Sequence, residues 1–168
     1  GFGGFQGNIG SISNRGLEFT LSTVNIDRSG DGGVRWNTDL NLSHNQNKVV
    51  QLVNDQPLFR GYTANGVSAT NVILPGQPLG TFWGLKFLGV DVATGDALYE
   101  DYNKDGRISP DDAQVIGTAQ PKVIGGFTNR ISWRNFDLSV FFQFTYGNKI
   151  LNFSNTTLLD NGANLENN

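Results

Sequence analysis

One segment of the sequence combines residue types and spacing that suit the binding of a metal ion. Residues 101–112, DYNKDGRISPDD, match the D-x-[DN]-x-[DN]-G pattern of calcium-binding loops. Oxygen ligands at alternate positions converge on one ion because the chain curls around it, and the glycine permits the sharp turn. The segment therefore predicts a structural calcium site with ligands from Asp101, Asn103, Asp105, the backbone carbonyl of Arg107, and Asp112.

The last ligand position distinguishes this segment from a calcium sensor. It carries Asp112, where EF-hand loops carry a bidentate glutamate, and the shorter carboxylate favours a weaker or more structural site. Residues 97–100 lead into the segment without a helical amphipathic pattern, and no second loop is present to pair with it, so no EF-hand domain is expected. A turn rich in Asp, Asn and Gly that binds no metal is the alternative.

Paired carboxylates are also a feature of hydrolases. Glu100 lies beside Asp101 and Asp111 lies beside Asp112, and such pairs can divide acid and base roles between them. Both pairs lie within or next to the calcium-loop pattern, so we interpret their charge as serving the metal. The sequence has no cysteine and a single histidine, His44, which leaves little room for other catalytic chemistry. We do not expect the chain to be an enzyme.

The chain as a whole is polar without being highly charged. Charged residues make up 16% of its 168 residues, against about 25% in a typical soluble domain. The net charge of −3 gives no electrostatic drive toward nucleic acid. Methionine is absent, even at position 1, so we expect the chain to be part of a longer one. The longest apolar runs are far short of the ~18 residues that a membrane helix needs.

Four segments alternate apolar and polar residues, which is the pattern of a β-strand with two different faces. These predicted strands lie near 15–26, 34–46, 123–133 and 136–147. In the last of them only Phe141 interrupts the polar face. Short turns join the first strand to the second and the third to the fourth, where Asn135 is suited to the positive φ of a two-residue turn. Residues 47–122 are predicted to form a long loop, with weak strand candidates near 80–90.

The length and composition of these strands indicate a membrane environment. Ten or more residues with one aromatic and aliphatic face and one face of Asn, Ser, Thr and Gln suit a crossing of the bilayer. Trp36, Trp133 and Phe136 lie within three residues of the short turns, where an aromatic girdle is expected. We predict an all-β fold of antiparallel strands, a partial transmembrane β-barrel of about four membrane strands. The alternative is a calcium-stabilised soluble β-sandwich for adhesion or carbohydrate binding. Its second sheet would cover Leu40, Leu42, Leu138, Val140 and Phe142.

Six motifs occur along the chain in a fixed order. They are NRGLE at 14–18, WNTDLNLSHNQNKV at 36–49, GTFWG at 80–84, DYNKDGRI at 101–108, IG at 116–117 with QPK at 120–122, and GFTNRISWRNFDLS at 126–139. Each is loose by itself, but together the set resembles the late barrel region of SusC/RagA-type TonB-linked, or TonB-dependent, outer-membrane proteins of Bacteroidetes. The resemblance spans nearly the whole chain.

This resemblance implies a barrel of about 22 strands closed by an N-terminal plug, in the outer membrane of a Gram-negative bacterium. Such a protein contacts outer-membrane lipid and imports oligosaccharides or peptides with a SusD-like surface lipoprotein, powered through the TonB complex. It also implies that the calcium-like loop is extracellular, so that the two short turns are periplasmic. The plug and the TonB-contacting segment are absent from residues 1–168, and we expect them in parts of the parent chain not present here.

Overall fold

The computed structural model describes residues 7–28, 30, 32–62 and 67–152, and within them the chain is all-β. The prediction of an all-β fold with antiparallel strands is confirmed. The chain divides into two compact units. Residues 13–47 and 121–148 form one, here called the strand unit, and residues 1–12, 48–120 and 149–168 form the other, here called the loop unit. Among the described residues, no helix is long and apolar enough to cross a membrane.

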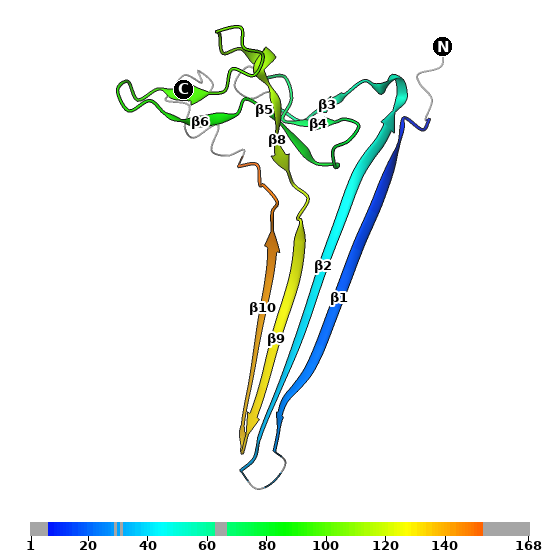
Figure 1. Ribbon diagram of the computed structural model, residues 1–168, viewed down its shortest axis with the longest axis vertical. Helices are drawn as coiled ribbons and strands as arrows, with labels where there is room; N and C mark the ends of the chain where they lie inside the picture. Colours follow the sequence, from blue (N-terminus) through cyan, green and yellow to red (C-terminus); the bar gives the residue numbers. More distant parts are fainter. Residues whose placement is uncertain (1–6, 29, 31, 63–66, 153–168) are drawn as a thin grey trace, which may run out of the picture. The chain divides into compact units, whose positions relative to one another are not determined.

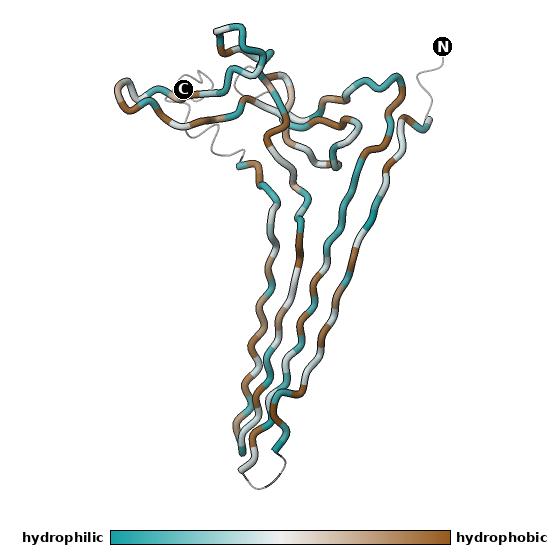
Figure 2. The backbone as a smooth tube through the Cα atoms, viewed as in Figure 1, coloured by the Kyte–Doolittle hydropathy of each residue, from teal (hydrophilic) through white to brown (hydrophobic). Residues whose placement is uncertain are grey.

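Four long strands make up the sheet of the strand unit. They are β1 (Gly10–Asp27), β2 (Val34–Leu52), β9 (Val123–Trp133) and β10 (Phe136–Tyr146), in the order β1-β2-β9-β10 (Figure 1). The register places Leu40, Phe127 and Phe142 in one row across three strands. Apolar and polar residues alternate along each strand, as Figure 2 shows by colour. The register therefore gathers most of the apolar residues on one face and most of the polar residues on the other.

Two strands are longer than the sequence pattern predicts. β1 begins at Gly10 rather than near residue 15, and β2 continues to Leu52 rather than ending near 46. From His44 to Lys48 both faces of β2 carry polar residues, so the alternation gives no signal there. Backbone hydrogen bonds do not depend on side-chain polarity, and the pairing continues to the bond from Val53 N to Ile9 O at 2.8 Å. The ends of β1 and β2 therefore lie where their backbone hydrogen bonds stop, beyond the segment in which apolar and polar side chains alternate.

The two hairpin turns differ in what they require of the sequence. In the turn between β1 and β2, Gly33 N donates to Gly30 O at 2.8 Å. A Cβ on Gly33 would lie 1.7 Å from the carbonyl oxygen of Arg28, so only glycine fits. In the turn between β9 and β10 the positive φ, 54°, falls on Arg134 and not on Asn135. The expectation for Asn135 is therefore wrong. The first central residue takes the left-handed conformation, while the Arg134 guanidinium lies 5.1 Å from the centre of the Trp133 ring.

Two adjacent glycines are the buried residues of the strand unit, within the part of the chain that the structure describes. A Cβ on Gly125 would lie 2.4 Å from the Phe144 ring, which covers this position on the apolar face. A Cβ on Gly126 would lie 3.2 Å from the Phe141 ring on the polar face. Aromatic rings placed over glycines are a known way to fill a sheet surface. The space above Gly126 thus explains why Phe141 interrupts the polar face.

The loop unit contains more regular structure than the sequence predicts. Residues 47–122, expected to be a long loop, hold six short strands and two 3₁₀ turns. These are η1 (Val53–Asp55), β3 (Leu58–Arg60), β4 (Asn71–Ile73), β5 (Thr81–Gly84), β6 (Phe87–Val90), β7 (Ala97–Tyr99), η2 (Pro110–Asp112) and β8 (Gln114–Thr118). One small sheet has the order β3-β4-β5-β8, and β6 pairs with β7. Strands of 3 to 5 residues are too short to show a period, which is why alternation misses them.

The hydrophobic core of the described residues lies in the loop unit. Its buried apolar residues are Val49, Leu52, Val67, Ala69, Val72, Phe82 and Ala113. Phe59 and Trp83 pack edge to face beside it, with ring centroids 5.5 Å apart. The small sheet therefore folds around a compact centre. That centre anchors β8, which immediately follows the acidic segment 101–112.

Candidate functional site

The acidic segment 101–112 lies between β7 and β8 and folds around the side chain of Asp101. One carboxylate oxygen of Asp101, Oδ1, accepts hydrogen bonds from the backbone N–H groups of Lys104 at 2.6 Å and Asp105 at 3.2 Å. The other, Oδ2, accepts from Gly106 N at 2.9 Å. Lys104 and Gly106 have positive φ, 63° and 82°, so the chain turns sharply at both. The first residue of the predicted calcium loop thus organises the curl that the pattern predicts.

The last residue of the pattern, Asp112, closes the loop from its other end. Its side chain is fully buried, and it accepts hydrogen bonds from Tyr102 N at 2.9 Å, Asn103 N at 3.2 Å and Ser109 N at 2.8 Å. The bond from Ser109 is the largest of the causes that lower the pKa of Asp112 below its usual value. The bonds from Asn103 and Tyr102 lower the pKa further. Asp112 is therefore held ionised and ties both ends of the segment together.

The remaining predicted ligands are joined to one another within the same loop. Asp105 accepts from Arg107 N at 2.8 Å and from Asn103 Nδ2 at 3.3 Å. Asn103 Oδ1 accepts from Asp105 N at 2.9 Å. Among the described residues, no three His, Cys, Asp or Glu side chains are grouped closely enough to hold a metal by themselves. A metal in this loop would therefore need the amide of Asn103 and a backbone carbonyl as well, and the calcium ligand set stays a prediction.

The chemistry of the donors is compatible with a hard cation. A carboxylate has about four lone-pair positions, and the backbone bonds to Asp101 and to Asp112 use three on each. At least one position on each carboxylate is therefore left for a cation. Two carboxylates close together also repel each other unless a positive charge lies between them. The donor set fits calcium, which prefers oxygen ligands.

The surroundings of Glu100 favour its ionised form, whereas a catalytic acid must hold its proton. Its carboxylate accepts from Gln114 Nε2 at 2.7 Å and lies 3.1 Å from the Lys86 ammonium. The hydrogen bond from Gln114, followed by that from Lys86, lowers the pKa of Glu100. A general acid for hydrolysis needs a raised pKa instead. The Glu100–Asp101 pair is therefore suited to fixing the loop.

The apolar face of the strand unit is exposed. Leu138 and Phe142 on β10 are 56% and 59% exposed, and Leu17 on β1 is 77% exposed. A soluble β-sandwich would require a second sheet over these side chains, but the described residues of the strand unit form a sheet of a single layer. A continuous exposed apolar surface of this kind marks contact with a membrane or another protein.

The opposite face of the sheet carries charged and amide groups that pair across the strands. Asp39 accepts from Ser22 Oγ at 2.7 Å and forms an ion pair with Arg130. Asn47 Nδ2 donates to Asn14 Oδ1 at 2.6 Å. This polar lining suits the water-filled or plugged interior of a barrel.

A polar cluster on the apolar face was not expected from the sequence. Trp36 Nε1 and Thr38 Oγ1 both donate to Asn129 Oδ1, at 2.9 and 2.8 Å, and Asn25 Nδ2 donates to Thr38 Oγ1 at 2.6 Å. The sequence does contain a signal for this cluster, because the alternation along β1 shifts by one residue. Apolar residues occupy odd positions up to Leu21 and even positions from Val24. This change places Asn25 beside Thr38.

A single-layer antiparallel sheet with one apolar and one polar face is typical of one class of protein, the transmembrane β-barrel, whose wall has this construction. Comparisons with known proteins identify the relatives of the chain within that class. It is 36% identical to TonB-dependent receptor P26 of Formosa agariphila over 90% of its length, and 32% identical to TonB-dependent receptor P3 of the same organism over 95%. The chain covers 16% and 17% of these two proteins, about a sixth of their length. No protein-family model matches the chain.

Solved structures agree in fold. The "Structure of the RagAB peptide transporter" matches with a TM-score of 0.68 and 22% identity, over 83% of this chain and 16% of that one. A RagAB peptide importer in its closed-closed state matches with a TM-score of 0.63. The resemblance indicated by the motifs is thus confirmed: the chain is a relative of TonB-dependent receptors and has the fold of a segment of RagAB. This relationship also confirms the outer-membrane location and the expectation that the chain is not an enzyme.

Proposed function

We propose that the chain forms part of the membrane wall of an outer-membrane TonB-dependent transporter that imports oligosaccharides or peptides. The observation that carries this proposal is the exposed apolar face of the single-layer sheet, with polar pairs on the opposite face. In the described part of the chain, the outer edges of β1 and β10 have no strand partner. Open sheet edges are not tolerated in lipid, so further strands must pair with both edges.

The partners proposed for this transporter follow from its relatives. A solved structure with the same fold is described as the RagAB peptide transporter, which supports a peptide as one class of substrate and a second protein component. We propose that this component is a SusD-like surface lipoprotein and that import draws energy from the TonB complex. The turns at residues 28–33 and 134–135 then lie on the periplasmic side.

Uptake by intact cells tests this function. A strain that lacks the gene is expected to lose uptake of either a labelled peptide mixture or a labelled oligosaccharide mixture, and the full-length gene is expected to restore it. The same uptake should stop when TonB is deleted, because the energy source is then removed. Unchanged uptake of both mixtures in the deletion strain would contradict the proposal.

We propose further that segment 101–112 binds a structural calcium ion. Asp101, Asn103, Asp105 and Asp112 would hold it through side-chain oxygens, and Arg107 through its backbone carbonyl. The support is the curl of the backbone around Asp101, together with the fact that the Asp101 and Asp112 carboxylates accept hydrogen bonds from the consecutive N–H groups of residues 102–106. The ion would supply positive charge between these carboxylates and fix the link between β7 and β8.

Calorimetric titration of calcium into the protein in detergent tests this site. The wild type is expected to bind calcium and Asp105→Ala to bind it at least about tenfold more weakly, because one charged ligand is lost. Asp96→Ala, in the β6–β7 turn, is the matched control, since it removes the same charge outside the segment. Equal binding of calcium by the wild type and Asp105→Ala, or no binding by either, would show that segment 101–112 is not a calcium site.

A further inference from the structure

The polar cluster on the apolar face of the strand unit leaves one hydrogen-bond donor unpaired. Asn129 lies on β9, between Thr38 of β2 and Val140 of β10. The indole N–H of Trp36 can only donate, so the amide oxygen of Asn129 is the atom beside it, and this oxygen also accepts from Thr38 Oγ1. The NH2 group occupies the other branch of the amide. No described residue accepts a hydrogen bond from it.

The unpaired NH2 group of Asn129 can be reached from outside the sheet. Among the described residues, the side-chain polar atom that is both enclosed by protein and unpaired belongs to Asn37, not to Asn129. Both strands next to β9 are part of the described sheet, so no further strand can pair over this position. Leu138 and Phe142, on the same face, are more than half exposed. The acceptor must therefore come from whatever contacts this apolar face.

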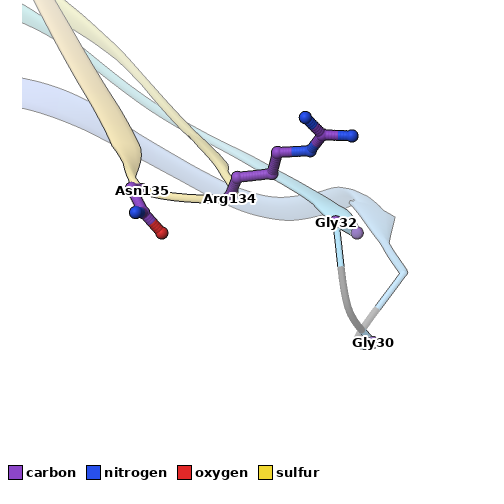
Figure 3. A pocket seen from close by; sticks show the side chains of 5 residues that line it. Gly30, Gly32, Arg134 and Asn135 are labelled. Carbon is purple, nitrogen blue, oxygen red and sulfur yellow. The ribbon is translucent and has the colours of Figure 1, made fainter.

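The position of Asn129 along β9 limits what can supply the acceptor. β9 ends at Trp133, directly before the turn of Arg134 and Asn135 that Figure 3 shows. Asn129 lies four residues before Trp133, which is about 13 Å along a strand and about 10 Å of depth at the usual tilt. Rings such as that of Trp133 lie among the headgroups, and the polar layer on each side of a bilayer is about 5–8 Å thick. Asn129 therefore lies at the inner edge of that layer, where an unpaired N–H group is unfavourable.

We propose that the NH2 group of Asn129 binds an ester carbonyl of a phospholipid in the periplasmic leaflet of the outer membrane. The inference rests on the proposed membrane function, because it needs the apolar face to contact lipid. Ester carbonyls accept hydrogen bonds and lie where the headgroup joins the acyl chains, at the level of Asn129. Trp36 and Thr38 fix the orientation of the amide, so the donor is in place before the lipid binds. The acyl chains can then lie along exposed side chains deeper in the membrane, such as Phe142.

Native mass spectrometry of the full-length protein in detergent tests the site. The probes are two phosphatidylethanolamines of equal chain length, one with ester-linked chains and one with ether-linked chains, which lack the carbonyl. The wild type is expected to retain the ester lipid about fivefold better, because the ether lipid cannot make the hydrogen bond. Asn129→Val should lose this preference. Asn41→Val is the matched control and should keep it, since it removes the same amide from the polar face of the neighbouring strand β2.

Two results would overturn the inference. In one, the wild type retains the two lipids equally. In the other, Asn129→Val prefers the ester lipid as the wild type does. Flotation with vesicles of the ester lipid shows whether each protein inserts, and Asn129→Ala takes the place of Asn129→Val if the valine variant does not. A wild type that inserts but shows no preference contradicts this site alone, whereas a wild type that does not insert contradicts the membrane function and the site together.

Discussion

Replacing Phe142 by arginine is expected to lower the free energy of unfolding in lipid by about 2–4 kcal/mol, the cost of a basic side chain near the middle of the lipid face of a barrel. Replacing its neighbour Gln143 by arginine should have little effect. The two residues are adjacent on β10 and their side chains point to opposite faces of the sheet. Phe142 lies in the apolar row with Leu40 and Phe127, and Gln143 belongs to the polar face.

Reversible unfolding of the full-length protein in phospholipid vesicles measures both free energies. Because the inserted residue is the same and its neighbours along the strand are nearly the same, the difference reports the two environments. Equal costs for Phe142→Arg and Gln143→Arg would show that the apolar face does not contact lipid. A compact monomer of the wild type in buffer without detergent would contradict the membrane assignment and favour a soluble β module.

Replacing Asp112 by alanine is expected to open the loop between β7 and β8. The substitution leaves three buried or partly buried N–H groups, those of Tyr102, Asn103 and Ser109, without their acceptor. Hydrogen exchange of these three amides should become at least about tenfold faster. Asp111→Ala is the matched control because Asp111 is the adjacent carboxylate and is exposed. Exchange as slow in Asp112→Ala as in the control would show that the carboxylate does not hold the loop.

Acid is expected to have the same effect as the substitution. Backbone hydrogen bonds lower the pKa of Asp112 below its ordinary value of 3.8. The unfolded loop therefore takes up a proton more readily than the folded loop. The stabilisation is complete above pH 3.8 and is lost as the pH falls through the lower pKa of the folded state. Exchange measured with a calcium chelator present should show protection that persists to about pH 4 and then decreases.

The long strands could be predicted from the sequence because their two faces meet different environments. Trp36, Leu40 and Leu42 alternate with Asn and Asp residues, and the structure pairs them in the register that this alternation requires. The short strands of the loop unit could not be predicted in this way. β3 and β4 have 3 residues each, and their place depends on packing around Val72 and Phe82. Such contacts between distant residues leave no period in the sequence.

The acidic segment 101–112 could likewise be predicted only in part. The spacing of Asp101, Asn103 and Asp105 predicts a tight curl, because the glycine that follows permits the sharp turn. It does not reveal that Asp112 is buried and bound to three N–H groups, since an aspartate at the end of the pattern is equally compatible with an exposed ligand. The polar cluster around Asn129 was missed for a related reason. Its members lie on three strands, and only the register brings them together.

The fit of the Phe144 ring over Gly125 limits how this sheet can change during evolution. A methyl group at position 125 would collide with the ring, whereas the flexible end of the Leu42 side chain can shift away from it. A mutation at 125 is therefore tolerated only after the side chain at 144 has become smaller. Loss of the Phe144 ring before any change at position 125 is tolerated, because it leaves a gap on the lipid side that acyl chains can fill. Positions 125 and 144 should therefore vary together among descendants of this protein, with the change at 144 coming first.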